Sequence, residues 1–257
     1  MTDVSKQPST KRKLPWDKAY SMLTQQEVVK RIGVRFLRLG STAISVEDML
    51  ERVGYYAKEM QKYDVIVTKD EVYKQIIRYH MIEGSIIESH KEANTNDLVF
   101  SIIGPILEDF MNRTGRDTLR LMREKKIISV DAKTGGFKEF VVADVISDFE
   151  ESYILIIEAK ATVLDAAMNQ CLLALKDLDD RNNGYIIYGF VTTGDIWQMV
   201  SYDGASFVST DKFQVVFDTM CNNKKRWLTS YSILVDCIYA ALSTTGAPRK
   251  EKESVMV

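Results

Sequence analysis

The chain has few of the residues on which disulfide-linked and zinc-binding domains depend. It contains three cysteines in 257 residues, and they lie far apart, at Cys171, Cys221 and Cys237. An odd number at such spacing argues against a disulfide framework and against a zinc ribbon. No apolar run approaches the roughly 20 residues of a membrane helix, and the beginning lacks the apolar core of a signal peptide. We therefore expect a protein that is intracellular or already processed, and that has no membrane partner.

Several catalytic signatures are also missing. There is no glycine-rich phosphate loop, no Ser-His-Asp set and no cysteine nucleophile. The segment Thr192-Thr-Gly-Asp195 has one glycine between two apolar runs, which predicts a hairpin turn. His80 and His90 are candidate metal ligands, but neither is spaced to a carboxylate motif, so ordinary surface positions are the simpler interpretation. Cys171 lies on the apolar face of an expected helix and is interpreted as core packing.

Neither sign of charge dominates the chain. The 34 lysines and arginines face 36 acidic residues, for a net charge of -2. This balance excludes a histone-like blanket of positive charge, although a local nucleic-acid groove remains compatible with it. Residues 113–139 carry eight basic and four acidic residues, a local charge of +4; they could contact phosphates or form a solvated strand edge. Lys11-Arg12-Lys13 is typical of a nuclear signal or of a solvated end.

The pattern predicts a mixed α/β fold, a sheet with flanking helices, behind a mostly helical first third. We expect a basic, disordered beginning at 1–14, a helical region at 15–91, an α/β domain at 92–245 and a charged tail at 246–257. Ser45-Val-Glu-Asp predicts a helix start within the second of these. The expected elements of the domain are a helix at 96–111 kinked or started late by Pro105, strands at 118–130, 140–146 and 153–158, a helix at 163–178, strands at 185–191 and 196–202, and a helix at 227–241.

One group of charged residues in the domain forms a candidate catalytic site. Glu158-Ala-Lys160 follows the most apolar strand, and residues two apart on a strand share a face. Asp144 lies 14 residues upstream, and a hairpin centred on residue 151 would set it opposite Glu158 or one step diagonal to it. Buried carboxylates that face each other repel, and a hard divalent cation removes that repulsion. Lys160 would orient or help deprotonate a water, which predicts phosphodiester hydrolysis; a structural ion pair is the alternative.

These residues carry a resemblance. Val-Ala-Asp144-Val, then Ile-Ile-Glu158-Ala-Lys160, then Gln170 in the next helix resembles the PD-(D/E)xK nuclease superfamily. More narrowly, Gln170-Cys-Leu-Leu-Ala-Leu and Tyr188-Gly-Phe-Val-Thr-Thr-Gly194, together with the Trp and Tyr-Asp-Gly that follow, are similar to nuclease-like domains of fungal and oomycete Crinkler (CR-type) proteins. The resemblance covers residues 92–245 and implies a restriction-endonuclease-like αβββαβ core.

The resemblance also implies an activity and a set of roles. The activity is that of a Mg²⁺- or Mn²⁺-dependent nuclease that binds nucleic acid, in the first place a DNA endonuclease. Asp144 and Glu158 would be metal ligands, Lys160 the water-activating or charge-stabilising residue, and Gln170 a supporting residue of the site. The proline that often precedes the aspartate in this superfamily is Ala143 here.

The acidic residue that the superfamily often carries on its first helix is not settled by the pattern. Asn96, Asp97 and Glu108 compete for the position, and we expect Asp97 and Glu108 as candidate metal ligands. If Asn96 is the equivalent, an acidic ligand has been lost. The chain would then be a catalytically inactive binding or effector module that acts through protein or nucleic-acid partners. A protein partner at the helical region and a homodimer both stay open.

Overall fold

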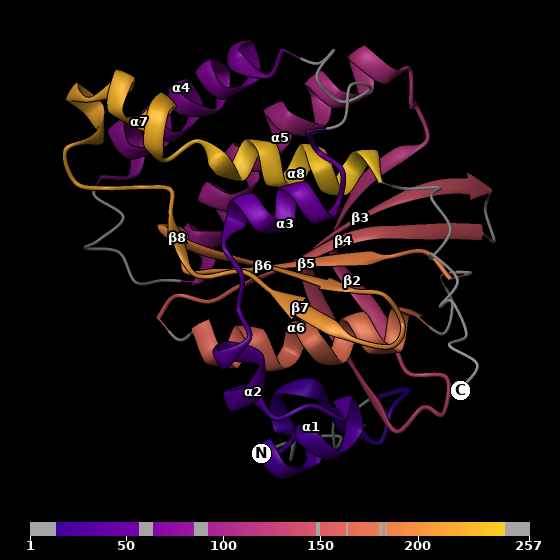
Figure 1. Ribbon diagram of the computed structural model, residues 1–257. Helices are drawn as coiled ribbons and strands as arrows, with labels where there is room; N and C mark the ends of the chain where they lie inside the picture. The colour runs from indigo at the N-terminus through magenta and orange to yellow at the C-terminus, as the bar shows by residue number, and fades with distance from the viewer. Residues whose placement is uncertain are drawn as a thin grey trace, which may run out of the picture.

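A mixed sheet with helices on both faces forms the centre of the computed structural model (Figure 1). The structure describes residues 14–56, 64–84, 92–147, 150–162, 164–179, 182 and 184–244. The basic segment before Leu14, His90 and the tail at 246–257 lie outside these residues. The α/β class and the mixed sheet predicted from the sequence are confirmed.

The sheet is built mainly from the second half of the chain. Its strands in the described residues are β1 Lys18–Ala19, β2 Leu119–Ile128, β3 Thr134–Ser147, β4 Glu150–Ala159, β5 Ile187–Thr192, β6 Ile196–Tyr202, β7 Phe207–Ser209 and β8 Phe213–Gln214. The strand order is β1-β3-β4-β5-β6-β7, with β2 paired to β3 and β8 paired to β6. β2, β3 and β4 form an antiparallel meander, and β4 runs parallel to β5. A parallel pair needs a crossover, and α6 Leu164–Asp179 provides it.

Helices cover the two faces of the sheet unequally (Figure 1). On the α6 side lie α1 Gln25–Ile32 and α2 Phe36–Ser41, and the other side carries α3 Val46–Arg52, α4 Ile66–Glu83, α5 Glu92–Thr114, α7 Lys224–Ser230 and α8 Ile233–Ser243; the short 3-10 turns are Tyr20–Met22 and Met220–Asn222. Each face has its own apolar core. β4 contributes to both, which explains its nearly continuous apolar run. None of the described helices combines the length and apolar character that crossing a membrane requires.

Most expected elements of the second half are present with altered bounds. Ser45 caps α3 as predicted, by accepting from the backbone N–H of Asp48 at 3.0 Å, and Thr192–Asp195 connects two antiparallel strands. The first helix of the domain begins at Glu92, four residues before its expected start, and continues through Pro105. The turn expected at Gly135 lies earlier in the chain, because that glycine is already paired within β3. The single helix expected at 227–241 is divided into α7 and α8.

The segment before α1 is fixed to the sheet by two aromatic side chains. Trp16 and Tyr20 lie over consecutive glycines of β3, Gly135 and Gly136. A Cβ atom at Gly135 would meet the Trp16 ring at 2.6 Å, and one at Gly136 would meet the Tyr20 ring at 2.7 Å. Only glycine leaves room for this approach. β1 begins two residues after Trp16 and pairs with β3 in parallel.

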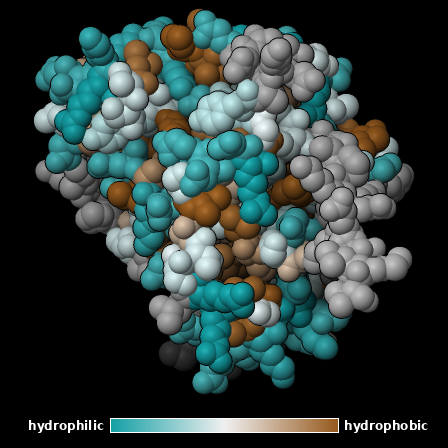
Figure 2. All heavy atoms as spheres, in the orientation of Figure 1, coloured by the Kyte–Doolittle hydropathy of each residue, from teal (hydrophilic) through white to brown (hydrophobic). Residues whose placement is uncertain are grey.

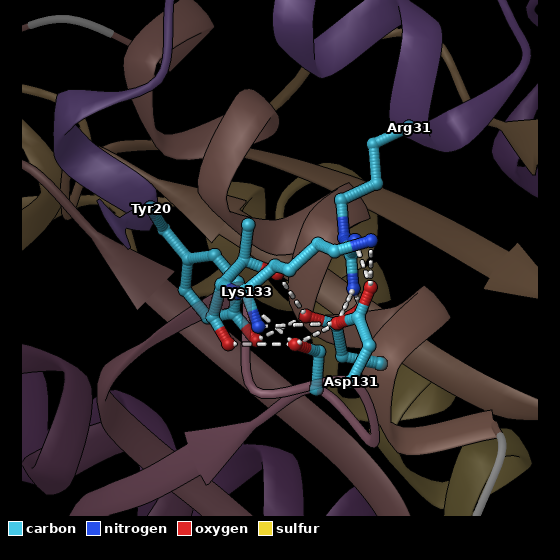
Figure 3. A network of polar contacts seen from close by, with 7 residues as sticks. Tyr20, Arg31, Asp131 and Lys133 are labelled. Atoms are coloured by element: carbon cyan, nitrogen blue, oxygen red, sulfur yellow. Dashed lines mark hydrogen bonds and ion pairs between the residues drawn. The ribbon is translucent and has the colours of Figure 1, made fainter. Parts of the chain in front are cut away.

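A polar network joins the same segment to α6 (Figure 3). The Asp177 carboxylate, at 2% exposure, accepts hydrogen bonds from Tyr20 Oη at 2.8 Å, Arg31 Nη2 at 2.9 Å and Thr134 Oγ1 at 3.0 Å. Arg31 reaches from α1 toward Asp131 as well, as Figure 3 shows. Burial raises the pKa of Asp177 even though these partners favour its charged form. The network therefore connects residues from the N-terminal segment, β3 and α6.

Candidate active site

The register of β3 against β4 decides which carboxylates meet. Phe140 pairs with Ile157 and Asp144 pairs with Ser152, which centres the hairpin near residue 148. The prediction that Asp144 faces Glu158 is therefore wrong. Residue 151, the expected centre of the hairpin, lies in β4, whose first residues are the exposed Glu150 and the half-buried Glu151 and Ser152.

Asp144 has other partners. It forms an ion pair with Arg116, and Thr118 Oγ1 donates a hydrogen bond to it at 3.1 Å. Arg116 also donates to the Leu242 carbonyl at 2.8 Å. Asp144 therefore helps to hold the residues after α5 and the end of α8 against the sheet.

The residue that the register sets opposite Glu158 is Glu139. Lys160 Nζ donates to Glu139 Oε1 at 2.6 Å and to Glu92 Oε1 at 2.7 Å, and it lies 3.4 Å from Glu158 Oε1. Lys138 Nζ donates to the other oxygen of Glu158, Oε2, at 2.8 Å. We call Glu92, Lys138, Glu139, Glu158 and Lys160 the carboxylate–lysine cluster. It combines three acidic and two basic side chains from α5, β3, β4 and the residue after β4.

Three oxygen atoms in and beside this cluster are buried without a hydrogen bond in the described part of the chain. They are Asn96 Oδ1, Glu139 Oε2 and Glu158 Oε1. A cleft of about 370 Å³ opens beside them, and it is lined by Glu92, Asn96, Arg123, Glu124, Phe137, Lys138 and Glu139. Buried acceptors without donors are costly unless water or an ion satisfies them. The cleft is lined by Asn96 and Glu139, whereas Glu158 is fully buried and is not among its lining residues.

The ionisable groups of the cluster change one another's pKa values. Burial raises the pKa of Glu139, and the nearby Glu158 carboxylate raises it further. The carboxylates of Glu158, Glu139 and Glu92 raise the pKa of Lys160 above its usual range, although partial burial opposes them. Lys160 is consequently a cation at neutral pH, while Glu139 takes up a proton more readily than an ordinary glutamate.

A strand irregularity brings Glu139 to this position. Lys138 lies against the Tyr20 ring at 4.9 Å, whereas Phe140 is in the core on the α5 side of the sheet. Residues two apart share a face in a regular strand, so the alternation is broken at Glu139. On the neighbouring strand, Glu124 has a positive φ of 51° and separates the paired residues on either side. The register of β2 against β3 is the same on both sides of the break, so it redirects side chains without inserting a residue in either strand.

The other predicted site residues are distributed over a wider area. Asp97 is exposed and lies 3.6 Å from Arg123. Glu108 lines a separate apolar hollow on α5, about 24 Å along the helix axis from Glu92. Gln170 is half-buried on α6, and within the described residues its side chain makes no hydrogen bond to the cluster. His80, expected at the surface, is half-buried on α4, and burial lowers its pKa.

Sequence reasoning placed Glu158 and Lys160 together but missed Glu92, Lys138 and Glu139. Glu92 lies outside the helix expected at 96–111. A hairpin centred between residues 148 and 149 sets Glu139 opposite Glu158. Asn96 was named as an alternative and lines the same cleft as Glu139.

The described residues contain no group of three or more His, Cys, Asp and Glu side chains arranged to hold a metal ion. The cluster offers two carboxylates, Glu139 and Glu158, with their lysines interleaved. Comparison with models of known protein families, with curated proteins and with solved structures found no match. The function is therefore inferred from the residues of the site and their chemistry.

Proposed function

We propose that this chain is a divalent-cation-dependent nuclease with a restriction-endonuclease-like core, and that DNA is its first candidate substrate. The element order α5, β2, β3, β4, α6, β5 supports the expected αβββαβ core. Glu139 replaces Asp144 as the acidic residue of β3, and Glu92 replaces Asp97 and Glu108 as the acidic residue of the first helix.

The observation that carries the proposal is the pair of adjacent carboxylates, each with one unsatisfied buried oxygen. Glu139 Oε2 and Glu158 Oε1 have no hydrogen-bond donor in the described residues, and the cleft reaches the first of these side chains. Mg²⁺ is usually bound through one or two carboxylates while water and substrate phosphates complete its shell. Two adjacent carboxylates, each with a buried oxygen that accepts no hydrogen bond, fit this requirement, although Glu158 Oε1 lies 3.4 Å from Lys160 Nζ. Asn96 Oδ1 would be a further oxygen ligand in the same cleft.

The residues of the cluster would have different roles in the reaction. Glu139 and Glu158 would hold Mg²⁺ or Mn²⁺, which would supply charge stabilisation and an activated water. Lys160 would donate N–H bonds to a phosphate oxygen, because its raised pKa keeps it protonated at neutral pH. This makes it a charge stabiliser rather than a general base. Glu92 would orient Lys160 through the 2.7 Å hydrogen bond.

The position of the cluster is set by α5 and by the parallel strands. Glu92, the first residue of α5 that the structure describes, lines the cleft. Lys160 lies directly after β4, where its backbone N–H donates to the Thr192 carbonyl of β5 at 2.9 Å. The site thus occupies the carboxyl ends of the two parallel strands.

The test compares cleavage by matched variants. Purified protein is incubated with plasmid, single-stranded DNA and RNA in Mn²⁺, Mg²⁺ or EDTA. We expect metal-dependent cleavage that Glu139→Gln lowers by about 100-fold or more. Asp144→Asn is the control, because it changes an acidic residue of the same strand outside the cluster, and it should leave the rate close to wild type. Absence of cleavage in every condition, or equal loss in both variants, contradicts the proposal.

A binding module is the second candidate, and one observation favours it. Lys138 and Lys160 already neutralise most of the charge of the three carboxylates, since three acidic and two basic groups leave only -1. Calorimetric titration with Mn²⁺ separates the two functions. A nuclease requires Mn²⁺ binding that disappears in Glu158→Gln, whereas a module without metal chemistry would release no heat of binding.

A further inference from the structure

The cleft beside the carboxylate–lysine cluster has a flat aromatic wall. Phe137 is 54% exposed and lines the cleft together with Asn96 and Glu139. The Trp16 ring packs against it edge to face, with centroids 5.7 Å apart, and Trp16 is itself buried against Gly135. The Phe137 ring is therefore supported from one side and open to solvent on another. An exposed aromatic ring held in this way loses little conformational entropy when a ligand stacks on it.

Cationic groups flank this ring. Lys126 is the cross-strand partner of Phe137, and directly opposed residues of an antiparallel pair have Cβ atoms about 5 Å apart. Lys126 is exposed, and it forms no ion pair with any residue that the structure describes. Arg123 lines the same cleft, with its guanidinium over the Phe140 ring at 5.3 Å and over the Phe100 ring at 5.7 Å. The wall thus combines a stacking surface, an uncompensated ammonium and a positioned guanidinium.

The chemistry of this wall selects its ligand. A flat ring next to a free ammonium fits a base and the adjoining phosphate of one nucleotide. The volume of the cleft, about 370 Å³, lies within the roughly 300–1,000 Å³ typical of small-ligand sites. In a duplex the faces of the bases are covered by their neighbours, whereas in a single strand they are free to stack on protein aromatics.

We propose that Phe137 and Lys126 form a subsite for an unpaired nucleotide, so that the protein binds single-stranded nucleic acid at this cleft. Phe137 stacks on the base, and Lys126 contacts the phosphate. This inference deepens the proposed function, because it names the strandedness of the substrate that would reach Glu139 and Lys160. The binding itself does not depend on cleavage.

Fluorescence anisotropy in EDTA tests the subsite without any cleavage. The probes are a labelled single-stranded DNA, a single-stranded RNA of the same sequence, and a DNA hairpin whose stem has that sequence. We expect the protein to bind at least one of the single strands more tightly than the hairpin, with Phe137→Ala weakening that binding about tenfold and Phe137→Trp retaining it. Lys126→Gln should reduce the slope of log affinity against log salt by about one. Ile146→Ala, at an equally exposed position near the other end of β3, is the control and should bind as wild type does.

The outcomes separate this inference from the nuclease proposal. Equal affinity for hairpin and single strands, or unchanged binding by Phe137→Ala, overturns the subsite even if the protein cuts DNA. Binding that depends on Phe137 in a protein that cuts nothing supports the subsite and removes the nuclease. A preference for DNA or for RNA identifies the sugar, and tight binding of either strand supports the subsite.

Discussion

The most constrained residues of the candidate site are a buried ion pair. Lys138 and Glu158 are both at 0% exposure, and their charged atoms are 2.8 Å apart. The ammonium of Lys138 also lies 4.9 Å from the centroid of the Tyr20 ring, which gives a cation–π contact in addition. Two charges are rarely buried unless each neutralises the other. In this protein the pairing also turns the remaining oxygen of Glu158 toward Lys160.

Removing one partner of this pair is expected to destabilise the fold strongly. In Lys138→Met the Glu158 carboxylate stays buried without its ammonium, which typically costs about 3–5 kcal/mol of unfolding free energy. Urea unfolding in EDTA measures the loss. The double variant Lys138→Met with Glu158→Leu should recover most of it, since an apolar pair of similar volume needs no charge compensation. A single variant within about 1 kcal/mol of wild type would mean that solvent reaches the pair.

In the proposed site, Lys160 would compete with a metal ion for the same carboxylates. Its ammonium lies 2.6 Å from Glu139 Oε1 and 3.4 Å from Glu158 Oε1. In Lys160→Met this competitor is removed, so we expect Mn²⁺ to bind several-fold more tightly in calorimetry while cleavage falls sharply. A purely structural lysine would instead change both quantities in the same direction, and weaker Mn²⁺ binding by Lys160→Met would contradict the prediction.

Residue patterns alone could place two of the five residues of this cluster. Strand alternation puts Glu158 and Lys160 on one face, and they do converge. The partner carboxylate depended on the centre of a hairpin, and a shift of that centre from residue 151 to a point between residues 148 and 149 exchanges Asp144 for Glu139. Local polarity favoured both centres, because exposed strand positions and turn positions have similar composition. Single-residue propensities do not predict the change of sheet face that occurs between Lys138 and Phe140.

Among the elements, the segment from Trp16 to Tyr20 supports the site from outside the αβββαβ order. It pairs with β3 through β1, and its two aromatic side chains occupy the space over Gly135 and Gly136. Trp16 supports Phe137, and Tyr20 lies beside Lys138. The N-terminal part of the chain therefore packs directly on the strand that carries Glu139.

A methyl group at Gly136 should disturb this packing. The added Cβ in Gly136→Ala would lie 2.7 Å from Tyr20 Cδ2, and overpacking of a filled interior typically costs about 1–3 kcal/mol. Gly104→Ala is the matched control, because nothing lies within 4 Å of its Cβ and it is inside α5; alanine there should stabilise the protein by up to about 1 kcal/mol. Thermal unfolding of both variants measures the difference, and equal melting temperatures would contradict the close packing.

Elements with strong local signals were predictable and their long-range partners were not. The apolar stripe of α6, the Ser45 cap and the β5–β6 hairpin follow from spacing within a few residues. The contact between Tyr20 and Asp177 joins residues 157 positions apart, and no local pattern encodes it. The same holds for the pairing of β1 with β3, since a two-residue strand carries too little alternation to be recognised.

For the whole molecule, the net charge of -2 hides an uneven distribution of ionisable groups. Many exposed carboxylates accept hydrogen bonds from cations or hydroxyls; the Lys18 and Thr24 side chains, for example, lower the pKa of Glu27 to about 2. Glu139 and Asp177 differ, because burial raises the pKa of each. The two groups of carboxylates make opposite contributions to the pH dependence of stability.

For Glu139, the raised pKa determines whether the unfolding free energy rises or falls with pH. Below its ordinary pKa of 4.5, Glu139 is protonated in both the folded and the unfolded protein. As the pH rises above that value, the unfolded chain loses the proton first, so the stabilisation from the raised pKa is progressively lost. The unfolding free energy of wild type minus that of Glu139→Gln should therefore fall as the pH rises above 4.5, by at most about 1.4 kcal/mol per pH unit for one proton.

A matched variant with the opposite sign completes the experiment. Ser129 and Arg31 lower the pKa of Asp131 well below its ordinary 3.8, so its stabilisation is present above that pH and is lost on acidification. The unfolding free energy of wild type minus that of Asp131→Asn should rise as the pH increases toward 4 and then stay level. Urea titrations in EDTA between pH 3 and 8 measure both curves, with the other carboxylates common to each comparison. A Glu139 difference that is flat or rises with pH would show that solvent, or a cation other than Lys160, already stabilises the charged carboxylate; the buried pair would then have no reason to recruit a metal ion.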